Sequence, residues 1–529
     1  MNFKCISLLF VAFVGMLSAC DSSGKKDNDW ALAQIPVIDE VGHTKLPDEI
    51  APVEAPFETI EFKKPVFPAD TVVLQLSNNQ INTVAINSAI SALSQQGGGT
   101  VIIPEGEWLT GRVELKSNIN LQIPAGSILR FSGWVKDFQP SVFTRIEGVE
   151  VMSLGACIYA NNQKNIAVTG SGNLIGPTGG DIRDRIDRSG VIENVILADT
   201  PIDERMYDGS QESGTIFAPM FISPINCENV YIEGVSLENT AFWNVVPIYC
   251  DGVIIRGIHV NSVGVPRGDG IDIESSRNVL IEYSTLSCGD DCFTMKAGRG
   301  EDGLRVNRPT ENVVVRYCLA REGHGAITCG SETAGMIRNL YVHDCVFEDT
   351  GVGIRFKTRR PRGGGGENLI YERIRMNLKN TAFRWDMLGG KMYVGELADR
   401  LPVRDVNDLT PKYKNIQAKD ILIENCSNFV RVNGIPESPL EDLSIENVEV
   451  KNCKTLFYAH DLVNASFRNM RIGSNDSVVG LLDARNVQFD NIRFNTAAPV
   501  VLDVQGDLSD SILIEECINV ENQLWTRAE

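Results

Sequence analysis

Short runs of alternating apolar and polar residues recur through most of the chain, and each run follows an Asn, Asp or Gly. Typical copies are ENVYIEGVSLEN, RNVLIEYSTLS and RNVQFDNIRF, in which apolar residues occupy every second position. A period of two predicts short strands with one buried face. We place the ten copies by their turn residues, which are Asn229, Gly252, Asn278, Asn312, Asn339, Asn368, Asp420, Asp442, Asn464 and Asn486.

The distance between successive copies indicates a solenoid. The last three steps are 22 residues each, and the longer steps elsewhere add insertions to this minimum. A constant minimum is typical of stacked coils that each contact only their neighbours. No helical pattern of useful length separates the strands, which excludes βαβ units and leucine-rich repeats. We therefore predict an all-β fold, a right-handed parallel β-helix, with most of its inserted residues between Asn278 and Asp420.

The open end of such a stack needs a cover, and the sequence offers one before the first coil. Residues Asn82 to Leu93 have apolar positions at helical spacing, a capping-type Asn at the start and the glycines Gly97–Gly99 after the end. We predict a short capping helix here. The strand of the first coil then follows at Thr100–Pro104.

The first twenty residues resemble a bacterial export signal. Lys4 precedes the apolar run Ile6–Leu17, which is too short to span a membrane. Leu17-Ser18-Ala19-Cys20 is similar to a lipoprotein cleavage box, in which the Cys becomes lipidated; an ordinary signal peptide is the alternative. We expect an exported lipoprotein of the periplasm or outer membrane with three parts: a signal peptide (1–19), the lipidated Cys20 with a polar tether (20–65) and the β-helix domain (66–529).

The net charge of the chain restricts the classes of polymer that it could bind. The chain has 49 basic and 69 acidic residues, a formal net charge of −20. Binding to nucleic acid through a broad basic surface is therefore excluded, and an acidic polymer would need a local cationic patch. We expect membrane contact only through the lipid anchor, and a monomer.

The number and spacing of the cysteines suggest that they pack in the core and do not form disulfides or bind a metal. Of the 13 cysteines, eleven lie beyond Cys20, an odd number that cannot pair completely. Neither a pair of CxxC motifs nor a Cys/His cluster at zinc spacing occurs. We expect these cysteines to be small buried side chains.

Acidic and cationic residues recur at coil spacing in the middle of the chain. Asp269 precedes Asp290 by 21 residues, about one coil, so the two are expected on neighbouring rungs. Adjacent acids cannot both point out of a straight strand, and we predict a bend at Gly289-Asp290-Asp291. Strand alternation places the side chains of Lys296, Arg355 and Lys357 outward. The candidate site residues from the pattern alone are Asp269, Asp290, Asp291, Lys296, His324, Arg355 and Lys357.

Clustered carboxylates suggest glycoside hydrolysis. One protonated acid donates to the leaving oxygen, and a carboxylate activates water. Repulsion between the acids raises one pKa and keeps that acid protonated. A cationic pair beside them suits a sugar carboxylate, because Arg binds carboxylates through two N–H groups. The pattern therefore predicts a uronic-acid polymer as substrate.

At these residues the chain resembles glycoside hydrolase family 28, the polygalacturonases. The family signatures Asn-Thr-Asp, Gly-x-Asp-Asp, Gly-His-Gly and Arg-x-Lys have counterparts here in the same order. They are Arg267-Gly268-Asp269, Gly289-Asp290-Asp291, Gly323-His324-Gly325 and Arg355-Phe356-Lys357. The similarity runs from about residue 80 to 500. It implies a pectin-lyase-like β-helix fold, inversion of configuration, and no metal or other cofactor.

The resemblance also implies roles for these residues. Asp290 would be the general acid, and Asp269 with Asp291 would hold and deprotonate the water. His324 would tune the acid, and Arg355 with Lys357 would hold the galacturonate carboxylate.

Inserted segments resemble those of bacterial exo-acting members. They are GRGEDGLRVNRPTENV, before His324, and GIPESPLEDL, near residue 434. Such insertions close one end of a cleft and favour release of terminal sugars. The nearby cations Arg359, Arg360 and Arg362 are candidates for a further carboxylate.

Two departures concern the substrate. Arg267 replaces the family Asn, placing a cation beside the acids, and Trp243–Pro247 lacks a His expected in exo-acting members. Both suggest galacturonate in another linkage, as in rhamnogalacturonan, besides homogalacturonan. We expect an exo-acting α-galacturonidase. The alternatives are an endo-acting hydrolase, a lyase, which would need calcium, and a pectin-binding lipoprotein without catalysis.

Overall fold

The computed structural model describes residues 34–42, 45–186, 190–197, 199–496, 498–519 and 526–527. The signal peptide and Cys20 expected from the sequence lie outside these residues. Among the residues described, no helix is long and apolar enough to cross a membrane.

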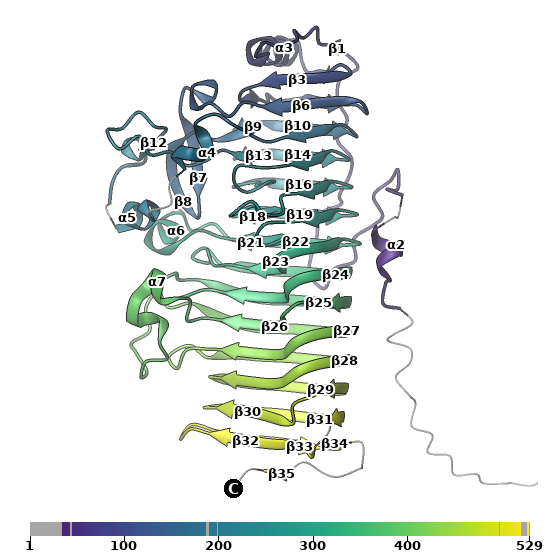
Figure 1. The fold of residues 1–529 in the computed structure, drawn as a ribbon, viewed down its shortest axis with the longest axis vertical. Helices are drawn as coiled ribbons and strands as arrows, with labels where there is room; N and C mark the ends of the chain where they lie inside the picture. Colours follow the sequence, from purple (N-terminus) through teal and green to yellow (C-terminus); the bar gives the residue numbers. More distant parts are fainter. Residues whose placement is uncertain are drawn as a thin grey trace, which may run out of the picture.

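The chain forms a right-handed parallel β-helix, as predicted, and Figure 1 shows its rungs stacked along one axis. Three columns of parallel strands run through the stack. In the first column, strands pair residue by residue from one rung to the next, for example Val253 beside Val279 and Val279 beside Val313. The strands are short in the first half of the chain and fuse across the corners in the second half.

The first column holds β1 (Thr71–Val73), β2 (Gly99–Ile102), β5 (Ile119–Ile123), β10 (Lys164–Gly170), β14 (Glu228–Glu233), β16 (Asp251–Arg256), β19 (Arg277–Glu282), β22 (Thr310–Arg316) and β33 (Asp510–Glu515). The second holds β3 (Gly106–Thr110), β6 (Ser127–Phe131), β11 (Asn173–Ile175), β15 (Ser236–Glu238), β17 (His259–Asn261), β20 (Thr285–Ser287) and β34 (Ile518–Asn519). The third holds β4 (Val113–Glu114), β9 (Ala156–Asn161), β13 (Met220–Ile225), β18 (Ile271–Glu274), β21 (Phe293–Lys296), β26 (Thr381–Asp386), β30 (Val478–Leu482), β32 (Val501–Gln505) and β35 (Thr526–Arg527).

Longer strands join two or three columns around a corner. They are β23 (Leu319–Cys329), β24 (Ile337–Lys357), β25 (Gly365–Asn377), β27 (Lys412–Asn433), β28 (Leu440–His460), β29 (Leu462–Ser474) and β31 (Arg485–Thr496).

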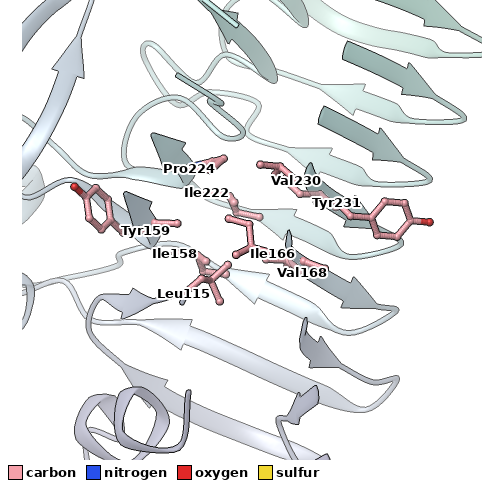
Figure 2. Close-up of a pocket in the computed structure, with 12 residues that line it drawn as sticks. Leu115, Ile158, Tyr159, Ile166, Val168, Ile222, Pro224, Val230 and Tyr231 are labelled. Carbon is pink, nitrogen blue, oxygen red and sulfur yellow. The ribbon is translucent and has the colours of Figure 1, made fainter. Parts of the chain in front are cut away.

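The core lies inside the coil, where alternate side chains of the three columns meet. Figure 2 shows Ile158 and Ile222 facing Ile166 across the interior, whereas Tyr159 and Tyr231 point outward on opposite sides. The isoleucines are fully or almost fully buried. Removal of these apolar surfaces from water stabilises each rung against the next.

The turn residues used to place the repeats form a ladder of side-chain amides. Asn312 donates to Asn278, Asn339 to Asn312 and Asn368 to Asn339, at 2.9–3.3 Å. These residues have positive φ, a conformation that Asn tolerates better than most residues. One predicted anchor is wrong. The neighbour of Asn368 is Asn415, 2.6 Å away, whereas Asp420 lies at the next corner, where it accepts from Asn447.

Helix α3 (Thr83–Gln95) covers the first coil, as expected, and buries Ile86, Ile90 and Leu93. The side chain of Asn82 does not cap this helix, contrary to the prediction. Its Oδ1 accepts from the backbone of Ser77 instead, so the side chain joins the preceding loop. A loop partner within reach competes with the cap.

The segment expected as a polar tether differs from the prediction between residues 45 and 65. Phe62 is buried against outward-facing side chains of the first column, and Pro47 and Ala51 carbonyls accept hydrogen bonds from Arg256 and Arg316. Helix α2 (Ile38–Gly42) packs with its Val41 on β23 and β24. The scattered apolar residues of this segment therefore cover the solenoid. We call residues 45–67 the strap.

Two protrusions leave the same side of the stack (Figure 1). The first contains β7 (Val142–Ile146), β8 (Val149–Ser153), β12 (Met206–Tyr207), α4 (Ile182–Arg185), α5 (Val191–Leu197) and α6 (Gly300–Val306). The second contains α7 (Lys391–Val394) and the turn η3 (Gly395–Ala398). The remaining short turns are η1 (Val135–Phe138) and η2 (Ile202–Glu204).

Candidate active site

The predicted acids lie on turns that lead into the third column. Asp269 precedes β18, and Asp290 with Asp291 precedes β21. Backbone hydrogen bonds stack these turns: Gly270 N–H donates to the Asp291 carbonyl at 2.9 Å, and His324 N–H to the Asp290 carbonyl at 2.8 Å. The periodic backbone therefore brings together four positions that are separated by up to 55 residues in sequence.

The three carboxylates form one cluster. One oxygen from each of Asp269, Asp290 and Asp291 lies within 4.8 Å of the others. Asp269 and Asp291 are buried, while the side chain of Asp290 is 26% exposed. The bend at residues 289–291 directs Asp290 and Asp291 to different partners, so that only Asp290 faces the open part of the site.

Asp291 is held ionised by two cations. Arg355 Nη1 donates to Oδ1 at 2.8 Å, and Lys357 Nζ donates to Oδ2 at 2.6 Å. Burial alone opposes ionisation, but Lys357 and Arg355 outweigh it and lower the pKa of Asp291. In the free protein these cations, expected to hold the substrate carboxylate, are thus bonded to Asp291. Both also line the pocket, with 22–23% of their side chains exposed.

Asp269 has the opposite electrostatic character. Burial first, and then the neighbouring carboxylates Asp272 and Asp290, raise its pKa well above its usual value, against the cation Lys296. This acid therefore keeps a proton more readily than Asp291 does. Repulsion between the acids contributes to the raised pKa of Asp269, but burial is the larger cause.

Lys296 lies among acids rather than out in the cleft. Its Nζ is 3.7 Å from Asp269, 3.6 Å from Asp272 and 3.3 Å from Glu332, and it lies 4.4 Å from the centre of the Trp243 ring. The side chain is only 3% exposed. It faces the pocket at one edge, and its main effect is to balance buried carboxylates.

His324 stands at the mouth of the site. Its side chain is 65% exposed, and Nδ1 is 2.9 Å from Asp290 Oδ1. This hydrogen bond raises the pKa of His324, although partial burial opposes the shift. The glycine after it is required sterically, because a Cβ at Gly325 would lie 2.8 Å from Asp291 Oδ1 and 2.4 Å from Thr328 Oγ1.

A pocket of about 540 Å³ extends from the acids to the carboxyl ends of the third-column strands. All predicted substrate-binding residues (Arg267, Lys296, Arg355, Lys357 and Arg359) line it. Arg267 lies at the rim, 42% exposed, and pairs with Glu147 at 3.0 Å. Arg359 lies deeper, over the ring of Tyr393. Arg360 is not part of the lining, because it pairs with Glu437 at 2.8 Å.

Sequence reasoning missed several residues of this pocket. Glu147 comes from the β7–β8 turn, Arg299 from the start of α6, Glu332 from the turn after β23, and Tyr393 from α7. These positions carry no repeat signal, because the loops that hold them are irregular insertions. The nearest available signal was the segment before His324, which the resemblance had marked as an insertion and which contains Arg299.

The carboxylate cluster has the spacing of a possible cation site. Its surroundings argue against one, since Arg355 and Lys357 already neutralise Asp291, and Lys296 faces Asp269. A divalent cation would have to enter next to three fixed positive charges. The arrangement is better suited to moving a proton and binding an anionic substrate.

Comparison with known proteins places this geometry in a family. The family model described as "Glycosyl hydrolases family 28" matches residues 205–383. The chain is 28% identical to a probable polygalacturonase of Vitis vinifera, over 70% of this chain and 71% of that protein. It is 24% identical to an exo-poly-alpha-D-galacturonosidase of Dickeya chrysanthemi, over 78% and 68%. The crystal structure of an exopolygalacturonase from Thermotoga maritima is 26% identical, with a TM-score of 0.64, and the match covers 79% of this chain and 93% of that one.

This match and these relatives support the assignment of the chain to glycoside hydrolase family 28. The chain is therefore a glycoside hydrolase, as its carboxylate cluster predicts. The matched residues of this family 28 protein include every predicted acid and cation of the pocket. Glu147 and Tyr393 lie outside them, so parts of the pocket walls come from segments that the family model does not cover.

Proposed function

We propose that this family 28 hydrolase is exo-acting and releases galacturonic acid from the ends of pectic chains. One observation carries the proposal: Arg359 and Arg362, on one wall of the pocket, are less exposed than His324 and Asp290 at its mouth. Side-chain exposure is 65% at His324 and 26% at Asp290, but 10% at Arg359 and 4% at Arg362. A polymer that continued past the acids in that direction would meet the pocket wall, whereas a chain end fits.

The wall is tied to the solenoid by ion pairs whose carboxylates are largely buried. Arg400, from the loop that follows α7, bonds to Asp461 and Asp483 at 2.6–2.8 Å on lower rungs. Arg360 pairs with Glu437 and donates to the carbonyls of Leu397 and Asp399. The second protrusion is therefore held in place without substrate, which favours a fixed pocket over an open groove.

The three acids have different surroundings, and we assign each a different role in the reaction on that basis. Asp290 is the exposed carboxyl, and in our proposal it delivers the proton to the leaving oxygen. Asp269 and Asp291 hold the water that attacks the anomeric carbon, and Asp291, which is ionised beside Arg355 and Lys357, accepts the proton that this water loses. One oxygen of Asp269, whose pKa is raised, lies within 4.8 Å of one oxygen of Asp290.

The distance between the acids raises the alternative that the reaction retains, rather than inverts, the configuration of the anomeric carbon. Inverting enzymes usually have acids about 6.5–9.5 Å apart and retaining enzymes about 5–5.5 Å. A separation within 4.8 Å favours retention through a covalent intermediate by that general rule. We propose inversion, because the family resemblance supports it and because both candidate nucleophiles are engaged by cations.

Product analysis tests the proposed function. The wild-type protein, incubated with chelator and either homogalacturonan or rhamnogalacturonan oligosaccharides, is expected to release free galacturonic acid as the only early product. Proton NMR is expected to show the β-anomer first from α-linked substrate. A ladder of oligosaccharides would contradict exo action, ultraviolet-absorbing products would indicate a lyase, and the α-anomer would indicate retention. The better substrate identifies the linkage.

The pH dependence of substrate binding should follow His324. Its pKa is raised, so the ring is cationic below that value and neutral above it. The substrate is anionic, and KM is therefore expected to rise as the pH increases through the raised pKa. The variant His324→Gln should have a high KM at all pH values, and its profile should lose this step. A step that persists in the variant would assign the titration to another group.

A further inference from the structure

Three arginines form a cluster at the enclosed end of the pocket. Arg299 follows β21, and Arg359 and Arg362 follow β24, so all three lie just beyond the carboxyl ends of strands two rungs apart in the third column. Their side chains are 3%, 10% and 4% exposed, and each lines the pocket. Cations this deeply buried are normally paired.

Among the three arginines, Arg299 makes the hydrogen bonds to the surrounding carboxylates. It bonds to Glu193 at 2.8 Å and to Glu147 at 2.6 Å. Arg362 approaches Glu332 and Glu193 only to 3.6–3.7 Å, and neither of its Nη atoms makes a hydrogen bond. Buried hydrogen-bond donors are rarely left without a partner in folded proteins, because an unpaired donor costs free energy. The unpaired donors of Arg362 therefore point to a ligand that accepts hydrogen bonds from them.

The electrostatics of Arg362 agree with its geometry. Burial, followed by repulsion from Arg299 and Arg359, holds the pKa of Arg362 well below its usual value. An anion placed among the three guanidinium groups would relieve that repulsion. Arg359 is held in position for such a ligand, because its guanidinium lies 4.3 Å from the centre of the Tyr393 ring.

Arg360, close to Arg362 in sequence, differs from it in its hydrogen bonds. Arg360 makes two hydrogen bonds to Glu437 and two to carbonyls, so its donors are used within the protein. The Nη donors of Arg362 remain free. Guanidinium groups bind carboxylates through paired N–H donors, which matches a uronic acid.

We infer that Arg299, Arg359 and Arg362 form a second carboxylate subsite, which receives the carboxylate of the terminal uronic acid of the substrate. The inference rests on the exo action proposed above, since only a chain end reaches this depth. It separates two tasks: Arg355 and Lys357 control Asp291 beside the bond that is cut, and the arginine cluster selects a charged terminal sugar.

Binding of a monosaccharide tests the subsite without catalysis. Calorimetry with galacturonic acid is expected to detect binding to the wild-type protein, and galactose, which lacks the carboxylate, is expected to bind far more weakly. Arg362→Gln should weaken galacturonate binding about ten- to hundredfold, as expected for removal of a charged hydrogen-bond partner. Arg359→Gln should weaken galacturonate binding in the same way. It replaces Arg362→Gln as the test variant if Arg362→Gln fails to fold. Arg468→Gln, an exposed arginine on β29, is the matched control and should leave binding unchanged.

Two outcomes would overturn the inference. One is unchanged galacturonate affinity in a folded Arg362→Gln or Arg359→Gln variant, and the other is equal binding of galactose and galacturonate by the wild type. Failure of the proposed function is seen separately, in the products. A protein that yields an oligosaccharide ladder but loses galacturonate affinity in these variants would keep a carboxylate-binding site at the three arginines, but the exo assignment and the terminal position of the bound sugar would both be lost.

Discussion

Asp290→Asn is expected to lower kcat by about 10²–10⁴-fold, the range that general acid catalysis contributes. Asparagine fills the same space but has no proton to give to the leaving oxygen. Asp290 is partly exposed and its side chain pairs with His324 alone among the described residues, so the fold should be retained. Substrate binding, measured by calorimetry with a trisaccharide, should stay within a few-fold of the wild type.

The control for this variant is Asp442→Asn. Asp442 accepts from Asn464 in the turn ladder, at a position where most other rungs carry Asn, and it is exposed. Its replacement should leave kcat unchanged. If Asp290→Asn keeps kcat within tenfold of the wild type, the proton comes from another group, and Asp269, with its raised pKa, is the candidate to replace next.

Glu282→Ala is expected to destabilise the protein by about 3–5 kcal/mol, the cost of removing one partner from a buried charge network. Glu282 is fully buried and bonds to Arg256 Nε at 2.8 Å and Arg316 Nε at 2.9 Å. Both arginines also donate to backbone carbonyls of the strap. The variant should therefore unfold at lower denaturant concentration, and proteases should cleave the strap sooner.

Glu228→Ala supplies the comparison on the same column. Glu228 pairs with Lys164 at 2.8 Å, but both side chains are more than half exposed. Exposed pairs contribute about 0–1 kcal/mol, so the denaturation midpoint should barely move. Equal effects of Glu282→Ala and Glu228→Ala would mean that the buried network does not hold the strap.

The candidate acids could be predicted because they repeat with the backbone. Asp269 and Asp290 are one coil apart in sequence, and parallel register converts that spacing into neighbouring positions. The anchor at Asp420 failed for a related reason. Two corners of each coil carry Asn or Asp with positive φ, and a large insertion before β27 hid the true neighbour of Asn368.

The prediction of a polar tether failed because its apolar residues lack a period. Phe62 and Ile50 pack on the outer face of the first column, where Tyr231 and Tyr341 provide apolar surface between polar neighbours. A single extended segment contacts successive rungs through isolated side chains. Such contacts leave neither a helical nor a strand pattern, so the strap could be identified only in three dimensions.

The sequence by itself determined the coil, its capping helix and the acids on successive rungs, because each depends on local periodicity and on backbone register. The tertiary structure decided what surrounds those acids. Arg299 meets Glu147 from a position 152 residues away, and Arg362 meets Glu332 from the turn of the preceding rung. Contacts between irregular insertions follow no period, and they determine the depth of the pocket and the free donors of Arg362.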